Sequence, residues 1–443
     1  MKNTRRFFIG LLAGYFLLLA FLVYWQLIIE LDQHPLNPGR YSVFRSPRGE
    51  ILDRNGQVLA ETIDDAQGTR RVYATSGTSH ITGYFHVRYG MSGLEQVWHE
   101  RLASGQKVHT TIDLGLQQRV EELLEGQVGA VVVMEPRTGQ ILALASYPYV
   151  DGNALSEKWP EYLTDQRSPF INRAVQGQYP PGSALKPLVL AAALESRAVS
   201  LEDRWNDRGV IELSGRRIAN FQGQALGEIN TKEALALSSN TVFAQLAAEL
   251  GSDLLHALQR FGLGTAPNFC LPTGAGNLPG SELSAYGWGQ VGIGQGPLLV
   301  TPLQMACAVS AIANGGTLMR PYLVQEIKGG WRFPKIQRPR VMSQVVPQWA
   351  AAGVRDAMVL AVRSGTAKSA QVPGILTAGK TGTAQTASGA DHSWFIGFAP
   401  ALDPAAAVVV LLEHGGTASQ TAAPLGGLVL WEALKAQGIL EGM

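Results

Sequence analysis

The sequence has only two cysteines, almost no net charge and one long hydrophobic run, and each scarcity excludes a class of protein. Cys270 and Cys307 are too few for a disulfide scaffold and lack the spacing of a metal site. They are either two free thiols or one bridge, and we favour free thiols because Cys307 lies in an apparent apolar helix. With 36 basic and 35 acidic side chains the net charge is +1, which gives no electrostatic footprint for nucleic acid.

The one long hydrophobic run, Phe7 to Ile29, predicts a transmembrane helix. Such a helix spans roughly 35 Å, enough to cross the hydrocarbon core of a bilayer. Lys2, Arg5 and Arg6 precede it, so the positive-inside rule places residues 1–6 in the cytoplasm and the rest of the chain outside. A cleaved signal peptide is the alternative, but the run is too long and no small-residue cleavage site follows. We therefore expect a single-pass protein in the cytoplasmic membrane.

The composition and hydrophobic pattern of the remaining chain divide it into two parts. Residues 30–125 are polar, rich in Arg and Gly, and read as a small extended stalk domain, with one helix predicted at Leu114–Leu124. Residues 126–443 show buried hairpins at both ends with helical stretches between them. This pattern predicts a mixed α/β fold with a mainly antiparallel sheet packed between helices. The expected hairpin strands are Ala130–Met134 with Ile141–Ala145, and Trp394–Phe398 with Ala407–Leu412, followed by a final helix at Leu425–Leu434.

One internal helix has clear start and stop signals. Pro302–Ala313 begins with Thr301 as its N-cap, and Gln304 completes a capping box. Pro302 suits the first helical position, where its missing N–H costs nothing. The glycines that follow residue 313 end the helix.

The central chemical pattern is Ser183-Ala-Leu-Lys186, which leads into an apolar segment typical of a buried helix. A spacing of three residues puts the hydroxyl and the amine on one helix face. A serine hydroxyl becomes a good nucleophile when a neighbour takes its proton, and burial beside other cations can keep a lysine neutral for that task. A second copy, Ser104 to Lys107, lies in a polar turn without a buried helix. Context therefore favours Ser183 over Ser104.

Two further elements follow in order along the chain. Ser238-Ser-Asn240 is the only Ser-x-Asn and lies between two helical stretches. Lys380-Thr381-Gly382 is the only Lys-Thr-Gly, in a segment of small residues that reads as a strand open to close approach by a ligand. Each element alone is weak, since Ser and Asn also cap helices and Gly-rich strand ends are common. The three together, in this order, are much harder to dismiss as coincidence.

These residues resemble the penicillin-binding protein and serine β-lactamase superfamily, and the flanks resemble its class B penicillin-binding proteins. The matching flanks are Arg48 to Ala60, Gly93-Leu-Glu95, Thr111-Ile-Asp113, Asn172-Arg-Ala174, Gly294-Gln-Gly296 and Thr301-Pro-Leu-Gln304. The resemblance implies a D,D-transpeptidase that cross-links peptidoglycan stem peptides through an acyl-serine, is acylated by β-lactams and requires no cofactor or metal. It also implies a polytopic glycan polymerase of the FtsW/RodA kind as a partner. Roles in division, elongation and sporulation all stay open.

The resemblance carries roles over to matching positions. Ser183 would be the nucleophile and Lys186 its general base. Ser238 would pass a proton to the leaving amine, and Asn240 would hold Lys186 or the substrate amide. In the Lys380-Thr381-Gly382 segment, Lys380 would keep Lys186 neutral and attract the terminal carboxylate of the substrate. Thr381 and Thr383 would bind that carboxylate, and the backbone N–H groups of Ser183 and Thr383 would form the oxyanion hole.

Several alternatives belong to other functional classes. A D,D-carboxypeptidase would use water as acceptor, and a β-lactamase or β-lactam sensor shares the three motifs. An inactive scaffold would carry the same anchor and stalk. Gly374 to Thr381 also matches the phosphate-loop pattern of nucleotide hydrolases, but no strand–loop–helix context supports it. We rank all four below the transpeptidase.

Overall fold

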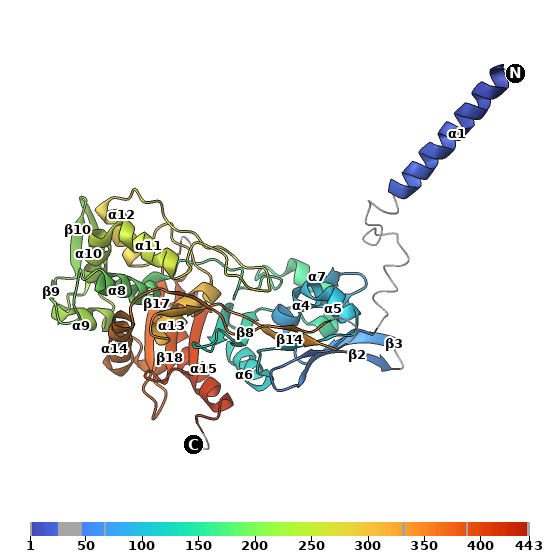
Figure 1. The fold of residues 1–443 in the computed structure, drawn as a ribbon. Coiled ribbons are helices and arrows are strands. Elements are labelled where there is room, and N and C mark those ends of the chain that lie inside the picture. Colours follow the sequence, from blue (N-terminus) through green and yellow to red (C-terminus); the bar gives the residue numbers. More distant parts are fainter. Residues whose placement is uncertain (1, 25–46, 66–67, 330–332, 387–388, 441–443) are drawn as a thin grey trace.

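The computed structural model describes residues 2–24, 47–65, 68–329, 333–386 and 389–440, and Figure 1 shows a long helix followed by an elongated body. Helix α1 (Lys2–Val23) contains the only span of the described residues that is long and apolar enough to cross a membrane, Thr4–Val23. None of this span is buried against other parts of the chain, so α1 fits a single-pass membrane protein. The rest of the expected anchor, residues 25–29, and the expected stalk residues 30–46 lie outside the described residues.

The stalk is built on a six-stranded sheet with the order β15-β14-β6-β1-β2-β3. Its pairs are antiparallel except for the parallel pair β1–β6. Two of its strands, β14 and β15, come from far down the chain, and Figure 1 shows β14 reaching into the stalk, where it pairs with β6. The strands are β1 (Ile51–Leu52), β2 (Val58–Asp65), β3 (Gly68–Tyr73), β6 (Lys107–Thr110), β14 (Val324–Lys328) and β15 (Lys335–Ile336).

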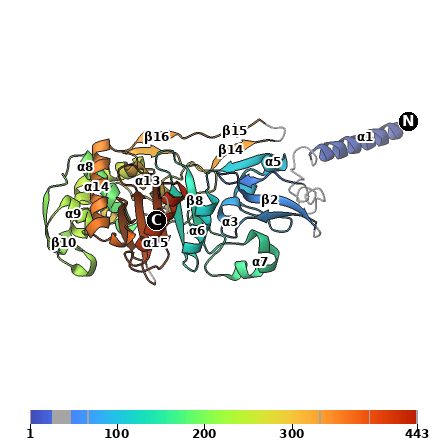
Figure 2. The same ribbon diagram turned by 90° about the horizontal axis from the view of Figure 1, so that it is seen from below.

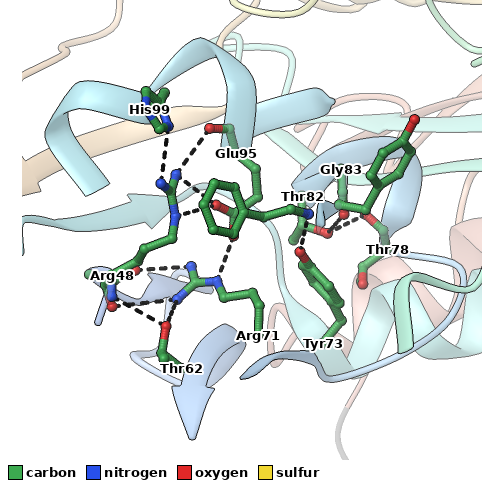
Figure 3. A network of polar contacts seen from close by, with 12 residues as sticks. Arg48, Thr62, Arg71, Tyr73, Thr78, Thr82, Gly83, Glu95 and His99 are labelled. Carbon is green, nitrogen blue, oxygen red and sulfur yellow. Dashed lines mark hydrogen bonds and ion pairs between the residues drawn. The ribbon is translucent and has the colours of Figure 1, made fainter. Parts of the chain in front are cut away.

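A buried ion cluster fixes short helices onto this sheet (Figure 3). Glu95, on helix α4 (Gly93–Val97), accepts from Arg48 at 2.9 Å and from Arg71 at 2.6 Å. Arg48 also donates to His99 on α5 (His99–Ala103) at 3.0 Å. Arg48 and Glu95 each belong to one of the flanking segments singled out in the sequence, and the cluster gives both side chains a structural role. The neighbouring elements are α3 (Ser79–Thr82), β4 (Phe85–His86), β5 (Gly90–Met91), η3 (Gly152–Ala154) and α7 (Leu155–Thr164).

The second sheet has five antiparallel strands in the order β17-β18-β19-β7-β8. Both predicted hairpins are confirmed, and they meet at the pair β19–β7, where Val410 lies opposite Val131. All residues of β7 and β19 are buried, so helices cover both faces. The strands are β7 (Gly129–Met134), β8 (Ile141–Tyr147), β17 (Ala378–Ala384), β18 (His392–Ala399) and β19 (Ala406–Leu412).

Helices pack on the two faces of this sheet as two separate hydrophobic clusters. Helices α6 (Leu114–Leu124) and α15 (Ala422–Ala436) cover one face, and α13 (Pro302–Ala313) with α8 (Lys186–Glu195) lies on the other. Figure 2 shows α13 and α15 on different sides of the sheet. The predicted helices at Leu114–Leu124, Pro302–Ala313 and Leu425–Leu434 are all confirmed, including the capping box of Thr301 and Gln304.

The structure also contains further helices and three short strand pairs. The helices are η4 (Gly182–Leu185), η5 (Phe221–Gly223), α9 (Thr231–Ala236), α10 (Asn240–Leu250), α11 (Ser252–Arg260), α12 (Ala285–Gly292), α14 (Gln348–Ser364) and η6 (Lys368–Ala370). The paired strands are β9 (Arg204–Asp207) with β12 (Gly227–Asn230), β10 (Val210–Leu213) with β11 (Arg216–Ala219), and β13 (Thr317–Met319) with β16 (Val341–Gln344).

Two minor questions left by the sequence are settled by this fold. Cys270 and Cys307 are both free, as favoured, and Cys307 lies in α13. The phosphate-loop interpretation is wrong. Lys380 and Thr381 lie within β17, which continues as a strand to Ala384 and pairs with β18, and the described residues between the two strands form no helix N-terminus that could hold a phosphate.

Candidate active site

The Ser183 hydroxyl is presented by η4, a single turn of 3-10 helix that leads directly into the buried helix α8. An α-helix starting at Ser183 would need an N–H from Pro187 to bond the Ser183 carbonyl, and proline has none. The N–H of Lys186 bonds that carbonyl instead, which is the 3-10 pattern. The predicted buried helix is therefore confirmed from Lys186 onward, and proline chemistry accounts for the tighter turn at the serine.

Strand β17 lies tightly against this turn because two glycines leave no side chain between them. A Cβ on Gly182 would lie 2.5 Å from the Thr383 carbonyl oxygen, and a Cβ on Gly382 would lie 2.7 Å from the Ala184 nitrogen. Gly182 also has φ +54°, a conformation that favours glycine. The backbone at Ser183 and the backbone at Thr383 are thus held close together, as an oxyanion hole made from both requires.

The Lys186 amine is fully buried and makes three short contacts with the Ser-x-Asn turn. Its Nζ lies 2.7 Å from the Ser238 carbonyl oxygen, 2.7 Å from Asn240 Oδ1 and 3.3 Å from Ser238 Oγ. A neutral amine has two N–H donors and one lone pair. Donating to the two carbonyl oxygens uses both donors and leaves the lone pair free to accept a proton from a hydroxyl.

The Lys380 amine reaches the same hydroxyl from β17. Its Nζ donates to Ser238 Oγ at 2.9 Å and to the Thr381 carbonyl oxygen at 2.8 Å. Burial lowers the pKa of Lys380 to about 7. Burial, and next the charge of Lys380, lower the pKa of Lys186 well below its usual value, while Asp207 opposes this shift. The two amines therefore flank one serine hydroxyl, and burial lowers the pKa of both.

The Ser-x-Asn turn has an unusual backbone that a buried carboxylate supports. Ser238 has φ +64°, a strained conformation for a residue with a side chain. Asp207 accepts from Ser239 Oγ at 2.6 Å and from the Asn220 amide at 2.8 and 2.9 Å. Asn220 Oδ1 in turn accepts from the Asn240 backbone N–H at 2.7 Å. Burial alone would raise the pKa of Asp207, but these hydrogen bonds outweigh it and the pKa is lowered.

An open cleft of about 640 Å³ gives access to this arrangement. Ser183, Ser238, Asn240, Thr381 and Thr383 line it, while the two lysines and Gly382 are buried within its wall. The structure thus brings together all eight residues that the sequence singled out: Ser183, Lys186, Ser238, Asn240, Lys380, Thr381, Gly382 and Thr383.

Sequence reasoning missed three residues that shape this site. Asp207 and Asn220 hold the Ser-x-Asn turn, and Thr366 places its hydroxyl 2.7 Å from that of Thr381. Asp207 lies in a polar segment with a glycine two residues later, so in sequence it looks like a surface turn. No local signal distinguishes these residues, because their partners lie far away along the chain. Among the described residues, no group of three or more His, Cys, Asp or Glu side chains is arranged to hold a metal ion.

Comparison with known proteins agrees with this geometry. Residues 129–429 match the penicillin binding protein transpeptidase domain, and residues 48–128 match the penicillin binding protein A dimerisation domain. The chain is 34% identical to the peptidoglycan D,D-transpeptidase PbpA of Mycolicibacterium smegmatis, over 88% of this chain and 89% of that protein. It is 33% identical to the peptidoglycan D,D-transpeptidase MrdA of Haemophilus influenzae, over 74% of this chain and 56% of that protein.

Solved structures show the same fold. The ceftriaxone acyl-enzyme complex of penicillin-binding protein A from M. tuberculosis superposes with a TM-score of 0.84 and 30% identity, covering 89% of this chain and 99% of that one. The D,D-transpeptidase domain of a peptidoglycan glycosyltransferase from Eggerthella lenta gives a TM-score of 0.83 and 33% identity, covering 89% of this chain and 100% of that one.

Proposed function

Since the chain belongs to the class B penicillin-binding proteins and is a serine-type peptidoglycan D,D-transpeptidase, we propose that Ser183 is the nucleophile and Lys186 its general base. The observation that carries this proposal is the environment of Lys186. Its fully buried amine donates to two carbonyl oxygens, and burial and then the charge of Lys380 lower its pKa well below the usual value, which favours the neutral form. A neutral amine one turn after a serine hydroxyl, at the wall of an open cleft, is suited to take the hydroxyl proton.

In the acylation step the Lys186 lone pair takes the Ser183 proton while Oγ attacks the carbonyl carbon of the penultimate D-Ala of the donor stem peptide. Backbone N–H groups of Ser183 and Thr383 hold the oxyanion, at about 3 kcal/mol for each donor. The C–N bond then breaks. The proton on Lys186 reaches the leaving D-Ala amine through the Ser238 hydroxyl, which lies 3.3 Å from Lys186 Nζ. An ester on Ser183 and free D-Ala result.

In the second step an amine of a neighbouring stem peptide attacks the ester carbonyl. Its proton passes to Lys186. As the ester C–O bond breaks, Lys186 gives that proton to Ser183 Oγ, and the enzyme is regenerated. Lys380, Thr381 and Thr383 bind the terminal carboxylate of the donor before D-Ala leaves. Gly382 has no side chain and therefore allows β17 to lie close to the turn that carries Ser183. A β-lactam acylates Ser183 by the same route and blocks the site.

Labelling with a fluorescent penicillin tests these assignments. We expect the wild-type protein to be labelled, Ser183→Ala to lose the label, and Lys186→Met to acylate slower by a factor on the order of 10³. Ser104→Ala is the matched control, because it removes the serine of the other Ser-x-x-Lys copy. Equal labelling of wild type and Ser183→Ala would mean that another residue is the nucleophile.

Product analysis with the same protein distinguishes the transpeptidase from the related activities. Release of D-Ala from a stem peptide should yield a cross-linked product when an acceptor amine is present. Release that continues unchanged with water as the acceptor would instead assign a carboxypeptidase. Rapid turnover of the labelled penicillin would assign a β-lactamase.

The placement of the chain in the cell follows from α1. We propose that residues 1–6 are cytoplasmic and that the stalk (residues 30–125) and transpeptidase domain (residues 126–443) lie outside the membrane, because Lys2, Arg5 and Arg6 precede the apolar run that begins at Phe7. We also propose a glycan polymerase of the FtsW/RodA kind as a partner of the anchor and stalk. Anchor and stalk variants that still associate with and stimulate the polymerase normally would count against this.

A further inference from the structure

Strand β3 forms one edge of the stalk sheet. At the end of β3, a side-chain amide forms the two backbone hydrogen bonds that a neighbouring strand would otherwise form. The Tyr73 backbone N–H donates to Asn153 Oδ1 at 3.0 Å, and the Tyr73 carbonyl accepts from Asn153 Nδ2 at 2.9 Å. Both outward groups of Tyr73 are therefore satisfied by one amide from the loop that precedes α7. Within the described part of the chain, no such partner is found for the rest of the edge.

The register of β2 and β3 identifies the open positions. Tyr73 lies opposite Ala60, Arg71 opposite Thr62, and Thr69 opposite Asp64. Outward-facing backbone groups recur at every second residue of an edge strand, so Arg71 and Thr69 point theirs the same way as Tyr73. Among the described residues, no hydrogen bond reaches the backbone N–H or C=O of Thr69 or Arg71 from that side. Four backbone groups are thus available to an added strand.

A cationic cavity of about 370 Å³ runs beside this open edge. Arg48, Arg70, Arg71 and His86 line it, with Glu157 as its only acidic lining residue. Residues 152–157 form the opposite wall, so the cavity is a groove bounded on one side by a strand edge. Its lining therefore favours a ligand with negative charge.

Among the described residues, two buried guanidinium groups beside the groove pair with one buried carboxylate. The side chains of Arg48 and Arg71 are 1% and 3% exposed, and both pair with the single buried carboxylate of Glu95 (Figure 3). His99 faces Arg48 Nη1 through Nδ1 at 3.0 Å, so it accepts there as a neutral ring. Its pKa is lowered by burial and then by Arg48. Two buried guanidinium groups thus share one carboxylate, and a second anion would complete the set.

Simple protection of the edge does not explain this arrangement. Edge strands are commonly blunted by prolines, bulges or charges that project outward. The β2–β3 pairing has a continuous register without a bulge, and β3 contains no proline. Arg71 turns inward to Glu95, and Arg70 pairs with Asp65 across the hairpin at 3.0 Å. The edge is therefore left ready for pairing.

We propose that the groove between β3 and residues 152–157 binds an extended, acidic segment of a partner protein, which adds to the sheet as a further strand. The backbone of the segment pairs with Thr69 and Arg71, as in other cases of strand addition. A carboxylate on its inward face enters the cavity beside Arg48 and Arg71. The proposal does not depend on the chemistry at Ser183, so acylation by penicillin reports the fold independently.

Binding of model peptides to the full-length protein in detergent tests the proposal. The probe is a fluorescent, end-capped peptide of about eight residues that alternates glutamate with valine, a length typical of one strand. The matched peptide has lysine in place of glutamate. We expect saturable binding of the acidic peptide alone, weakened by salt, with slower hydrogen exchange at the amides of Thr69 and Arg71. Failure of the acidic peptide to bind, or equal binding of both peptides, overturns the proposal.

Two variants at one position separate strand addition from simple charge attraction. Thr69→Pro removes an N–H that faces away from β2, so the ladder to β2 survives while pairing with an added strand is lost. Thr69→Val keeps that N–H and is the matched control. We expect roughly tenfold weaker binding for Thr69→Pro and little change for Thr69→Val, with penicillin acylation normal in both. Equal affinities of the two variants, or binding without protection of these amides, would exclude an added strand.

Discussion

The close approach of β17 to the nucleophile turn makes Gly382→Ala a sharp test of the active-site geometry. The new Cβ would lie 2.7 Å from the Ala184 nitrogen, 2.8 Å from the Ala184 Cβ and 2.8 Å from the Pro181 carbonyl oxygen. Carbon atoms in contact prefer a separation of about 3.5 Å, so β17 and the turn must separate by roughly 0.7 Å. These atoms are backbone or Cβ atoms of residues next to Ser183, and they cannot rotate away.

Two effects of different size follow from this displacement. Overpacking of a tight interface costs about 1–3 kcal/mol of unfolding free energy. A shift approaching 1 Å between reacting groups costs on the order of 100-fold in rate. We therefore expect Gly382→Ala to remain folded but to acylate with penicillin roughly 100-fold more slowly, because the Thr383 N–H no longer meets the same oxyanion as the Ser183 N–H.

Stopped-flow acylation and denaturant unfolding measure the two effects separately. The matched control is Gly280→Ala, because a Cβ at Gly280 meets nothing within 4 Å. We expect the control to acylate at the wild-type rate. If Gly382→Ala also acylates at the wild-type rate, the contact between β17 and the turn does not set the oxyanion geometry and our reasoning fails.

Three further predictions concern charge and support. Burial and then the charge of Lys380 lower the pKa of Lys186. Lys380→Met should therefore raise that pKa and move the acidic limb of the pH profile of the acylation rate to higher pH. An acidic limb that does not move would contradict the coupling between the two lysines. Asp207→Asn replaces a carboxylate oxygen that accepts a hydrogen bond with an amide group that donates one. We expect this variant to be labelled by the fluorescent penicillin about tenfold more slowly than wild type. Acylation at the wild-type rate would show that the Ser-x-Asn turn does not need the carboxylate. Burial raises the pKa of Glu121 to about 7 from 4.5, so the folded state keeps a proton that the unfolded chain loses in that window and stability falls as pH rises through it. Glu121→Gln should therefore be more stable than wild type by roughly 3 kcal/mol above pH 7, with no difference below pH 4, as measured by denaturant unfolding.

The grouping of the proposed reactive residues in one site was predictable because the proposed chemistry demands particular side chains at short spacings. Ser183 and Lys186 are one turn apart, and Lys380 lies in a strand whose small residues are visible in the sequence. The hairpin strands of the second sheet were predictable for a related reason, since continuous apolar runs bounded by turns must be buried. The 3-10 form of the serine turn follows from Pro187, but only once the hydrogen-bond partner of Ser183 is considered.

The parts that sequence could not reveal depend on contacts between distant segments. Asp207 supports a turn that lies some thirty residues further on, and nothing near Asp207 marks it as buried. Strand β14 was not expected in the stalk, because a short polar strand looks the same wherever it pairs. The excess charge of Arg48 and Arg71 is likewise invisible until the single carboxylate between them is located.

The pairing of β14 with β6 joins two segments that lie more than two hundred residues apart in the chain. A fragment that stops before residue 324 lacks this cover and exposes the whole length of β6, a template for aggregation. Any pull on the membrane helix reaches the sheet through β1, and from β6 it crosses directly to β14, the second strand after α13. Tension at the bilayer is therefore delivered to the catalytic half through backbone hydrogen bonds as well as through the covalent chain.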